Sequence, residues 1–176
     1  MSVSPWDTEI RTVSDLYSLP YGLVHAVVVI ESGGETSAWN PEPKYCWFWD
    51  VRRRAPFRRP LPLELESKTP PPDFPCLAGD PDQEWWAQQA SWGLMQVMGA
   101  VARELGCKLP YLTALCRPEV GLDYGCRYLR VLQDRYMDSA GWNGIIAAYN
   151  AGSPRRGVDG AFVNQGYVDK VRGVWT

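Results

Sequence analysis

The feature that most constrains the fold of this chain is a helical pattern of apolar residues between positions 119 and 137. The segment EVGLDYGCRYLRVLQDRYM follows Pro118 directly. Its larger apolar side chains recur at roughly helical spacing, at Val120, Tyr124, Leu129, Leu132 and Tyr136. An amphipathic helix buries its apolar face against other elements, so the pattern predicts a domain built from packed helices.

Further segments carry helix signals. The stretch YGLVHAVVVIES follows Pro20 and is closed by Gly33 and Gly34, although its four consecutive β-branched residues would suit a strand equally well. Other helices are expected in EWWAQQA from Glu84, in LMQVMGAVARELG up to Gly106, in GWNGIIAAYNAG up to Gly152, and in GYVDKVRGVW near the C-terminus.

The character of the chain changes between Trp39 and Pro81. This region is rich in proline, contains RRRAPFRR and KTPPPDFP, and has neither a helical nor a strand period. The sequence has no internal repeat and no alternating strand pattern. At 176 residues the chain suits one domain with its own core. We therefore predict a mainly α-helical single domain, residues 1–176, with an irregular Pro/Arg/Trp-rich insertion at about residues 40–83.

Charge and cysteine content argue against several classes of function. Eighteen basic and twenty acidic side chains give a net charge of −2, so no global field favours nucleic acid or a charged membrane. The longest apolar run, residues 26–30, is too short to span a bilayer. Five cysteines without a Cys-x-x-Cys pair do not indicate a zinc site, and no cofactor is expected. Buried free thiols are expected, with Cys46 and Cys76 as the pair that a disulfide could join.

Glu31 closes an apolar run and is the first candidate for chemistry. On a helix it shares one stripe with Val24, Val27 and Val28. A carboxyl group against apolar walls, at the negative end of a helix, should have a raised pKa, which suits a general acid. The alternative is a glutamate that reaches into water at the helix end, and helix geometry alone favours that alternative.

Two later motifs favour the catalytic interpretation. GLMQV, residues 93–97, places a thioether and an amide beside a glycine at an expected helix start, and AYNAG, residues 148–152, places a phenol and an amide at a helix end. Each motif alone would fit a core methionine or a helix cap. Together with Glu31-Ser32 and a later Tyr167, in this order, they resemble the marks of the soluble lytic transglycosylases and the related goose-type lysozymes.

The resemblance covers about residues 20–40 and 88–176 and implies a lysozyme-like helical fold. It also implies a groove that binds alternating N-acetylmuramic acid and N-acetylglucosamine, so the expected partner is the peptidoglycan glycan strand. Glu31 would protonate the oxygen of the β-1,4 bond that follows the muramic acid. In the transglycosylases the C6 hydroxyl of that sugar then closes on C1 to give a 1,6-anhydro product, and the same glutamate takes the proton as base.

Six further site residues are implied by the resemblance. They are Ser32, Met95, Gln96, Tyr149, Asn150 and Tyr167. One of the two tyrosines would hydrogen-bond and orient the glutamate. The serine and the glutamine would line the sugar site, the methionine would pack on a sugar face, and the asparagine would bind an N-acetyl or backbone group.

The insertion departs from the family pattern. Glu31 and Gly93 are 62 positions apart, against a couple of dozen in the family. The aromatic residues of the insertion and its five arginines between positions 52 and 59 suit an added groove wall that stacks on sugars and attracts anionic wall polymer or lipid head groups. A solvated loop whose tryptophans bury against the domain is an equally good interpretation.

A second carboxylate would allow hydrolysis instead of transglycosylation. An inverting lysozyme needs one about 6.5–9.5 Å from its acid, with room for a water molecule. The candidates are Glu35, Asp50, Asp80, Asp82 and Glu84. The motif set favours the non-hydrolytic route.

Two competing hypotheses are a non-catalytic wall-binding or virion module and a chitin- or chitosan-directed hydrolase on the same fold.

The N-terminal stretch MSVSPWDTEIRTVSDLYSLP has neither a basic region nor an apolar core, so no signal peptide is expected. In this respect the chain resembles phage cell-wall enzymes, either an endolysin or a lysozyme carried in the virion. The protein would then be made in the cytoplasm of the producing host cell and act on the wall after release or from the virion. A monomer is expected.

Overall fold

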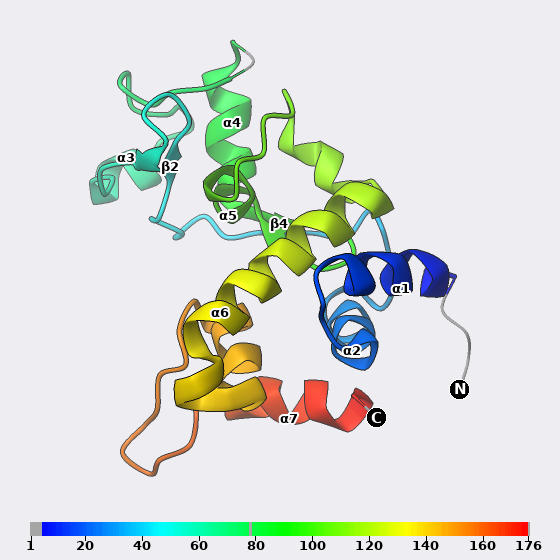
Figure 1. The fold of residues 1–176 in the computed structure, drawn as a ribbon. Helices are drawn as coiled ribbons and strands as arrows, with labels where there is room; N and C mark the ends of the chain where they lie inside the picture. The colour runs from blue at the N-terminus through cyan, green and yellow to red at the C-terminus, as the bar shows by residue number, and fades with distance from the viewer. Residues whose placement is uncertain (1–4, 78, 176) are drawn as a thin grey trace. The chain divides into compact units, whose positions relative to one another are not determined.

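The computed structural model describes residues 5–77 and 79–175. The first four residues, part of the stretch in which no signal peptide is expected, lie outside the described residues. The chain forms two compact units, one made of residues 1–34 with 125–176 and the other of residues 35–124. Figure 1 shows the elements along the chain. We call these the split unit and the continuous unit.

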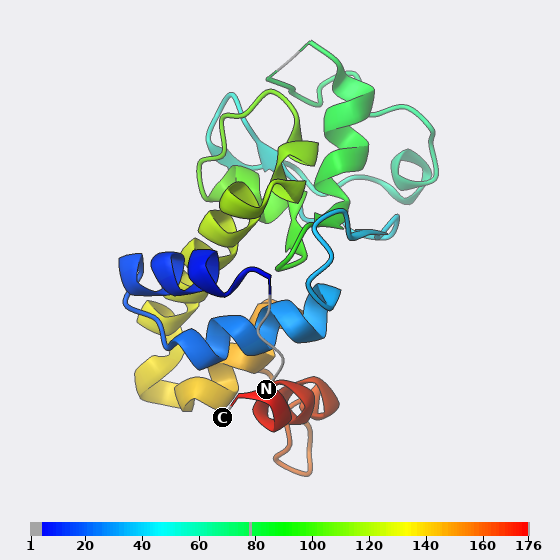
Figure 2. The same ribbon diagram turned by 90° about the vertical axis from the view of Figure 1, so that its right-hand side faces the viewer.

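The split unit is helical. Its helices are α1 (Asp7–Leu16), α2 (Tyr21–Ser32), the later part of α6 (Pro118–Ala151) and α7 (Gln165–Val174). Helix α2 packs against both α1 and α7, and Figure 2 shows the blue α1 and α2 and the red α7. The buried residues of this core include Leu23, Val27, Ile145, Ile146 and Val171.

Helix α2 confirms the predicted helix after Pro20 and excludes the strand alternative. It ends where predicted, because Gly33 takes the left-handed conformation with φ 63° and its N–H bonds the carbonyl of Val29. The β-branched residues are accommodated because α2 is covered by helices on two sides. Helix α1 was not predicted, since it buries just two of its ten described residues, Ile10 and Ser14, and so gives a weak pattern.

Helix α6 joins two predicted helices. Gly141 interrupts it with φ 59° and ψ −166°, which divides the segment near the point where the sequence predicts a second helix to begin. The helix ends before Gly152, whose φ is 75°. The predicted C-terminal helix is confirmed as α7.

The continuous unit mixes short strands and short helices. Strands β1 (Trp39–Pro41), β4 (Ala90–Trp92) and β5 (Val97–Met98) form an antiparallel sheet in the order β1-β4-β5, with Trp39 opposite Trp92. Strands β2 (Trp49–Asp50) and β3 (Ala55–Pro56) form a separate hairpin. The helices are α3 (Pro62–Leu65), α4 (Pro81–Gln88), α5 (Gly99–Glu104), the 3₁₀ helix η1 (Leu112–Cys116) and the start of α6.

The predicted helix from Leu94 is wrong over its first five residues. Residues 93–96 form the turn of the β4–β5 hairpin, and the helix begins at Gly99. Gly93 has φ 70° and Gln96 has φ 45°, both outside the helical range. The turn also fits closely, since a Cβ on Gly93 would lie 2.2 Å from the carbonyl oxygen of Leu115. The strands escaped prediction because two or three residues are too few to show alternation.

Part of the predicted insertion packs with α4 in a small aromatic core and is not a fully solvated loop. Phe48, Phe74 and Trp85 are buried together, and the rings of Phe48 and Trp85 are stacked at 4.1 Å between centroids and 4° between planes. The alternative in which all its tryptophans are buried is wrong for Trp39 and Trp47, which are both more than half exposed.

All five cysteines lie in the described part of the chain and are free, so no disulfide joins Cys46 to Cys76. Cys107 and Cys126 are buried as expected, whereas the other three are partly exposed. The mainly α-helical class is confirmed. Among the residues that the structure describes, no helix has the length and apolarity needed to cross a membrane.

Candidate active site

Glu31 lies in the last turn of α2, one residue before the helix ends. Val24, Val27 and Val28 are fully or almost fully buried, as the predicted apolar stripe requires, and Glu31 itself is partly buried. Glu31 therefore continues the buried valine stripe of α2 and lies at the border between the helical core and solvent.

Tyr167 makes the hydrogen bond to this carboxylate. Its phenol donates to Glu31 Oε1 at 2.5 Å, across 136 positions of sequence, because α7 packs against α2. Tyr167 is one of the two tyrosines that the resemblance offers for this role. Burial first, and then the negative charge and the hydrogen bond of Glu31, raise the pKa of the Tyr167 phenol. The phenol therefore stays protonated and remains a donor far above neutral pH.

Tyr149 lies beside the same carboxylate in the buried end of α6. Its ring centroid is 5.3 Å from that of Tyr128. Burial raises the pKa of the Tyr149 phenol strongly, and the charge of Glu31 raises it further. The carboxylate therefore has two neutral phenols in its surroundings.

The end of α2 is held by a local network around Ser32. The Ser32 hydroxyl donates to the carbonyl of Val28 at 3.1 Å and accepts from the N–H of Gly34 at 3.2 Å. The indole of Trp6 donates to the carbonyl of Gly34 at 2.9 Å. Sequence reasoning missed Trp6, since a bond between positions 28 apart leaves no local pattern. The network fixes the helix end that presents Glu31.

Asn150 is tied to a second residue that the sequence did not reveal. Asn164 Nδ2 donates to Asn150 Oδ1 at 2.9 Å and to the carbonyl of Ala147 at 3.0 Å. Asn164 directly precedes α7, the helix of Tyr167. These bonds join the end of α6 to the start of α7, and they thereby help to position the phenol against Glu31. Asn150 is exposed, so its remaining polar atoms can meet a ligand.

Met95 and Gln96 belong to the continuous unit. Met95 is fully buried. The Gln96 amide donates to the carbonyls of Ala38 and Gly93, both at 3.0 Å, and its Oε1 accepts from the Ser91 hydroxyl at 2.9 Å. Gln96 thus ties the hairpin turn to the chain before β1, and any sugar contact of these two residues stays a prediction.

The carboxylates considered as a second catalytic group mostly have structural partners. Glu35 accepts from the N–H and hydroxyl of Ser37, Asp50 accepts from two loop N–H groups, and Asp80 caps α4 through the N–H of Gln83. Glu84 is buried and bonds Arg103 at 2.7 and 2.8 Å. Asp82 is exposed at the start of α4.

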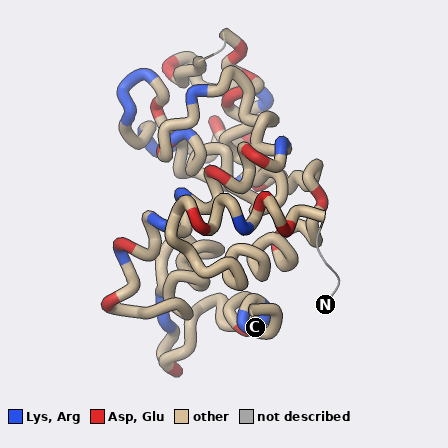
Figure 3. Tube along the Cα trace, turned by 45° about the vertical axis from the view of Figure 1, so that its right-hand side comes forward, with Lys and Arg blue, Asp and Glu red and all other residues tan. Residues whose placement is uncertain are grey.

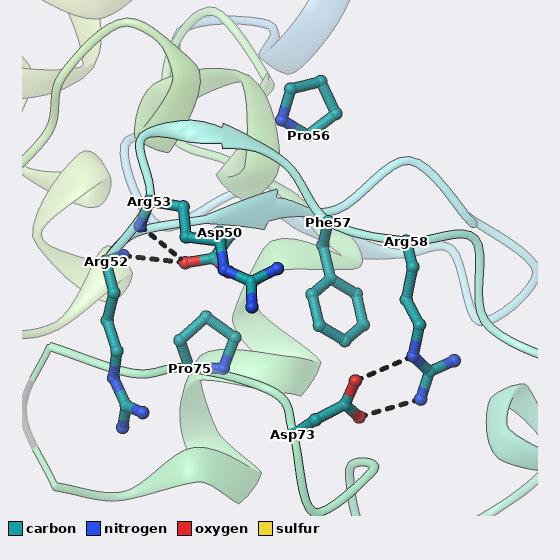
Figure 4. Close-up of a pocket in the computed structure, with 8 residues that line it drawn as sticks. All are labelled: Asp50, Arg52, Arg53, Pro56, Phe57, Arg58, Asp73 and Pro75. Carbon is teal, nitrogen blue, oxygen red and sulfur yellow. Dashed lines mark hydrogen bonds and ion pairs between the residues drawn. The ribbon is translucent and has the colours of Figure 1, made fainter.

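Figure 4 shows a pocket of about 280 Å³ beside the β2–β3 hairpin. Two of the three arginines that line it, Arg53 and Arg58, lie close to acids. Arg58 forms paired bonds of 2.7–2.8 Å with Asp73 and Glu64, which lower the pKa of both carboxyls, and Arg53 lies 3.8 Å from Asp50. The arginine run 52–54 forms a continuous basic segment in a chain of otherwise mixed charge (Figure 3).

A partly buried carboxylate at a helix end that accepts a hydrogen bond from a partly buried phenol fits the acid of a glycosidase site. The comparison with known families agrees with this class. The family model of the transglycosylase SLT domain matches residues 9–161, and the chain belongs to this family. Lytic transglycosylases of this family cleave peptidoglycan, so the chain carries a peptidoglycan-cleaving domain. Searches of curated proteins and of solved structures gave no match.

Proposed function

We propose that this protein cleaves the β-1,4 bond between N-acetylmuramic acid and N-acetylglucosamine in peptidoglycan by transglycosylation, with Glu31 as acid and then base. The observation that carries the proposal is the bond from the Tyr167 phenol to Glu31 Oε1 at the end of α2. It orients the carboxyl group that we propose as the proton donor.

The proposed reaction has two proton transfers. Glu31 gives its proton to the glycosidic oxygen, the bond from C1 to that oxygen breaks, and an oxocarbenium-like charge develops at C1. The C6 hydroxyl of the same muramic acid then bonds to C1, and its proton passes to Glu31, which restores the acid. The product carries a 1,6-anhydro ring and no water is consumed. The Tyr167 phenol stabilises the carboxylate while it is ionised.

The pairing of Glu84 removes one candidate for a hydrolytic base. A general base for water must be able to accept a proton, and Glu84 is unsuited because it is buried and paired with Arg103. The hydrolytic alternative would use Glu35, Asp50, Asp80 or Asp82.

The other site residues have supporting roles in this proposal. Tyr149 supplies a neutral, buried wall beside Glu31, and Asn150 binds an N-acetyl or backbone group of the glycan. Ser32 holds the end of α2 and lines the sugar site.

The proposal is tested by replacing the acid. Glu31→Gln keeps the size of the side chain but cannot donate or accept the proton, so lysis of purified cell walls should fall by about 10²-fold or more. Turbidity loss and zymography measure this. Glu119→Gln, at an exposed glutamate paired with Arg117, is the control and should lyse walls normally. Undiminished lysis by Glu31→Gln would overturn the proposal.

A non-catalytic wall-binding module is the second candidate. It predicts that the unaltered protein sediments with cell walls and releases no soluble muropeptides. Measuring bound protein and released sugar in one sample separates the two functions.

A further inference from the structure

Two adjoining hollows lie on the continuous unit, around the segment that follows β1. The first has a volume of about 480 Å³ and is lined by Trp39, Pro41, Glu42, Pro43, Trp86 and Gln89. The second, of about 550 Å³, is lined by residues 42–47 and includes Tyr45 and Trp47. They share Glu42 and Pro43, so they form one continuous surface. Each volume is in the range of small-molecule sites.

The tryptophans of the first hollow are exposed but fixed. Trp39 is 58% exposed and packs against Trp92, with 6.0 Å between ring centroids. Trp86 is 41% exposed, and its indole N–H donates to the carbonyl of Lys68 at 3.2 Å. Because neighbours hold both rings, a ligand would meet flat apolar faces without the cost of ordering them.

The backbone between the two hollows is also held in place. The N–H of Glu42 donates to the carbonyl of Gln89 at 2.7 Å, and the N–H of Tyr45 donates to the carbonyl of Glu42 at 2.8 Å. Pro41 and Pro43 flank Glu42 and restrict its backbone further. The hollows are therefore a preformed feature of the fold.

The first hollow suits a neutral ligand. Of the described residues that line it, Glu42 alone is charged. The second hollow contains Lys44, and the guanidinium of Arg59 lies over the Trp47 ring at 5.0 Å from its centroid. The Glu42 carboxylate can accept hydroxyl donors.

The side-chain amide of Gln89 is a second polar group on the lining of the first hollow. It is 1% exposed, its Nε2 donates to the carbonyl of Trp85 at 3.2 Å, and its Oε1 is buried without a hydrogen-bond partner among the described residues. Unpaired buried acceptors are rare in folded proteins. A hydroxyl or an N-acetyl N–H is a donor of the type that this oxygen lacks.

We propose that the hollows around Trp39, Trp86 and Trp47 bind consecutive N-acetylated sugars of a glycan strand, as a substrate-holding site separate from the acid at Glu31. The apolar faces of pyranose rings pack on indoles, while their hydroxyl and amide groups bond the carboxylate and amide beside them. This site rests on the proposed function, because the strand that it holds is the one to be cleaved.

The test uses the Glu31→Gln protein, so that no sugar is cleaved, and a β-1,4 tetramer of N-acetylglucosamine as the probe. Two-dimensional NMR of the indole N–H groups, assigned with Trp→Phe variants, follows each tryptophan separately. The signals of Trp39 and Trp86 should shift during the titration. Trp39→Ala and Trp86→Ala should each raise Kd by about tenfold, as the loss of a well-packed tryptophan contact does.

Tyr111→Ala removes another exposed aromatic of the same unit and is the matched control, which should keep the Kd unchanged. If an alanine variant does not fold, the indole shifts of the Glu31→Gln protein still decide the question. Unshifted Trp39 and Trp86 signals would overturn the sugar site. Shifts caused by a free stem peptide but not by the tetramer would also overturn it, in favour of a peptide site.

The result is separable from the test of catalysis. Wall lysis that survives in Glu31→Gln would contradict the proposed acid and leave the titration unaffected. If wall lysis depends on Glu31 but the indole N–H signals of Trp39 and Trp86 do not shift during the titration, the result would contradict the sugar site alone.

Discussion

The position and surroundings of Glu31 at the end of α2 depend on residues that are distant in the sequence. The valine stripe predicted the direction of its side chain, and the order of the motifs suggested a tyrosine partner. The sequence left Tyr149 and Tyr167 as equal candidates, and the packing of α7 on α2 gives the bond to Tyr167. Trp6 and Asn164 were not predicted, because their hydrogen bonds join positions far apart and have no local periodicity.

Tyr167→Phe tests the contribution of this phenol. It removes the donor to Glu31 and keeps the ring, so kcat on cell walls should fall by about 10- to 100-fold, the effect of losing about 1.5–3 kcal/mol from a bond to a charged group. KM should change little, since the bond acts on the acid and not on the sugar. Steady-state lysis kinetics measure both constants, and Tyr111→Phe is the control. An unchanged kcat would show that the bond has no role in the reaction.

The two phenols near Glu31 also predict how stability depends on pH. Tyrosine in the unfolded chain ionises near pH 10.0, whereas the pKa values of Tyr149 and Tyr167 are raised in the folded protein. Above about pH 10 the folded state then binds more protons than the unfolded state, so this stabilisation is complete below about pH 10 and is lost as the pH rises further.

Urea unfolding at about pH 9 and about pH 11 measures this dependence. The free energy of unfolding of the Tyr149→Phe/Tyr167→Phe protein should fall less between these pH values than that of the unaltered protein. An equal fall in both proteins would contradict the raised pKa values.

At the scale of elements, the success of the secondary-structure prediction depended on the length of each helix or strand. Helices α2, α6 and α7 have enough residues to show a helical period, and the glycines that end α2 and α6 were recognised. The strands are two or three residues long, and the GLMQ segment was assigned to a helix because its apolar residues continue into α5. Its true conformation depends on Gly93 and on the nearby carbonyl of Leu115, which no local pattern encodes.

Two glycine substitutions in the continuous unit distinguish the energetic cost of an unfavourable backbone conformation from the cost of a steric clash. Gly106→Ala places a Cβ at φ 90° with nothing within 4 Å, so it should cost about 1–2 kcal/mol. Gly93→Ala at φ 70° also forces the Cβ to 2.2 Å from the carbonyl oxygen of Leu115, so it should cost about 3 kcal/mol or more. Thermal unfolding of the two variants measures the difference. Equal losses would mean that the turn does not require the close approach.

At the scale of the whole molecule, the motifs identify the family without revealing how the chain is divided. Gly33 and Gly34 mark the first boundary between the units, but the second falls inside α6, where no loop signal exists. Composition predicted an insertion at about residues 40–83. The aromatic core of Phe48, Phe74 and Trp85 was not predicted, because these residues come together from separate segments.

The buried pair Glu84–Arg103 joins α4 to α5 and should be essential to the stability of the continuous unit. Both side chains are almost fully buried, and Arg103 also donates to the carbonyls of Cys107 and Leu109. Glu84→Gln leaves the arginine charge buried without its partner, so the free energy of unfolding should fall by about 3–5 kcal/mol. Chemical denaturation measures the fall, and Glu119→Gln, in an exposed pair, should change nothing measurable. Native stability in Glu84→Gln would contradict this role.

The most direct measurement of the central claim is mass spectrometry of the muropeptides released from purified cell walls. Transglycosylation through Glu31 predicts products that end in 1,6-anhydro-N-acetylmuramic acid when the unaltered protein acts, and none of these products with Glu31→Gln. Products with reducing ends that have gained water, or anhydro products that persist in Glu31→Gln, would contradict the claim.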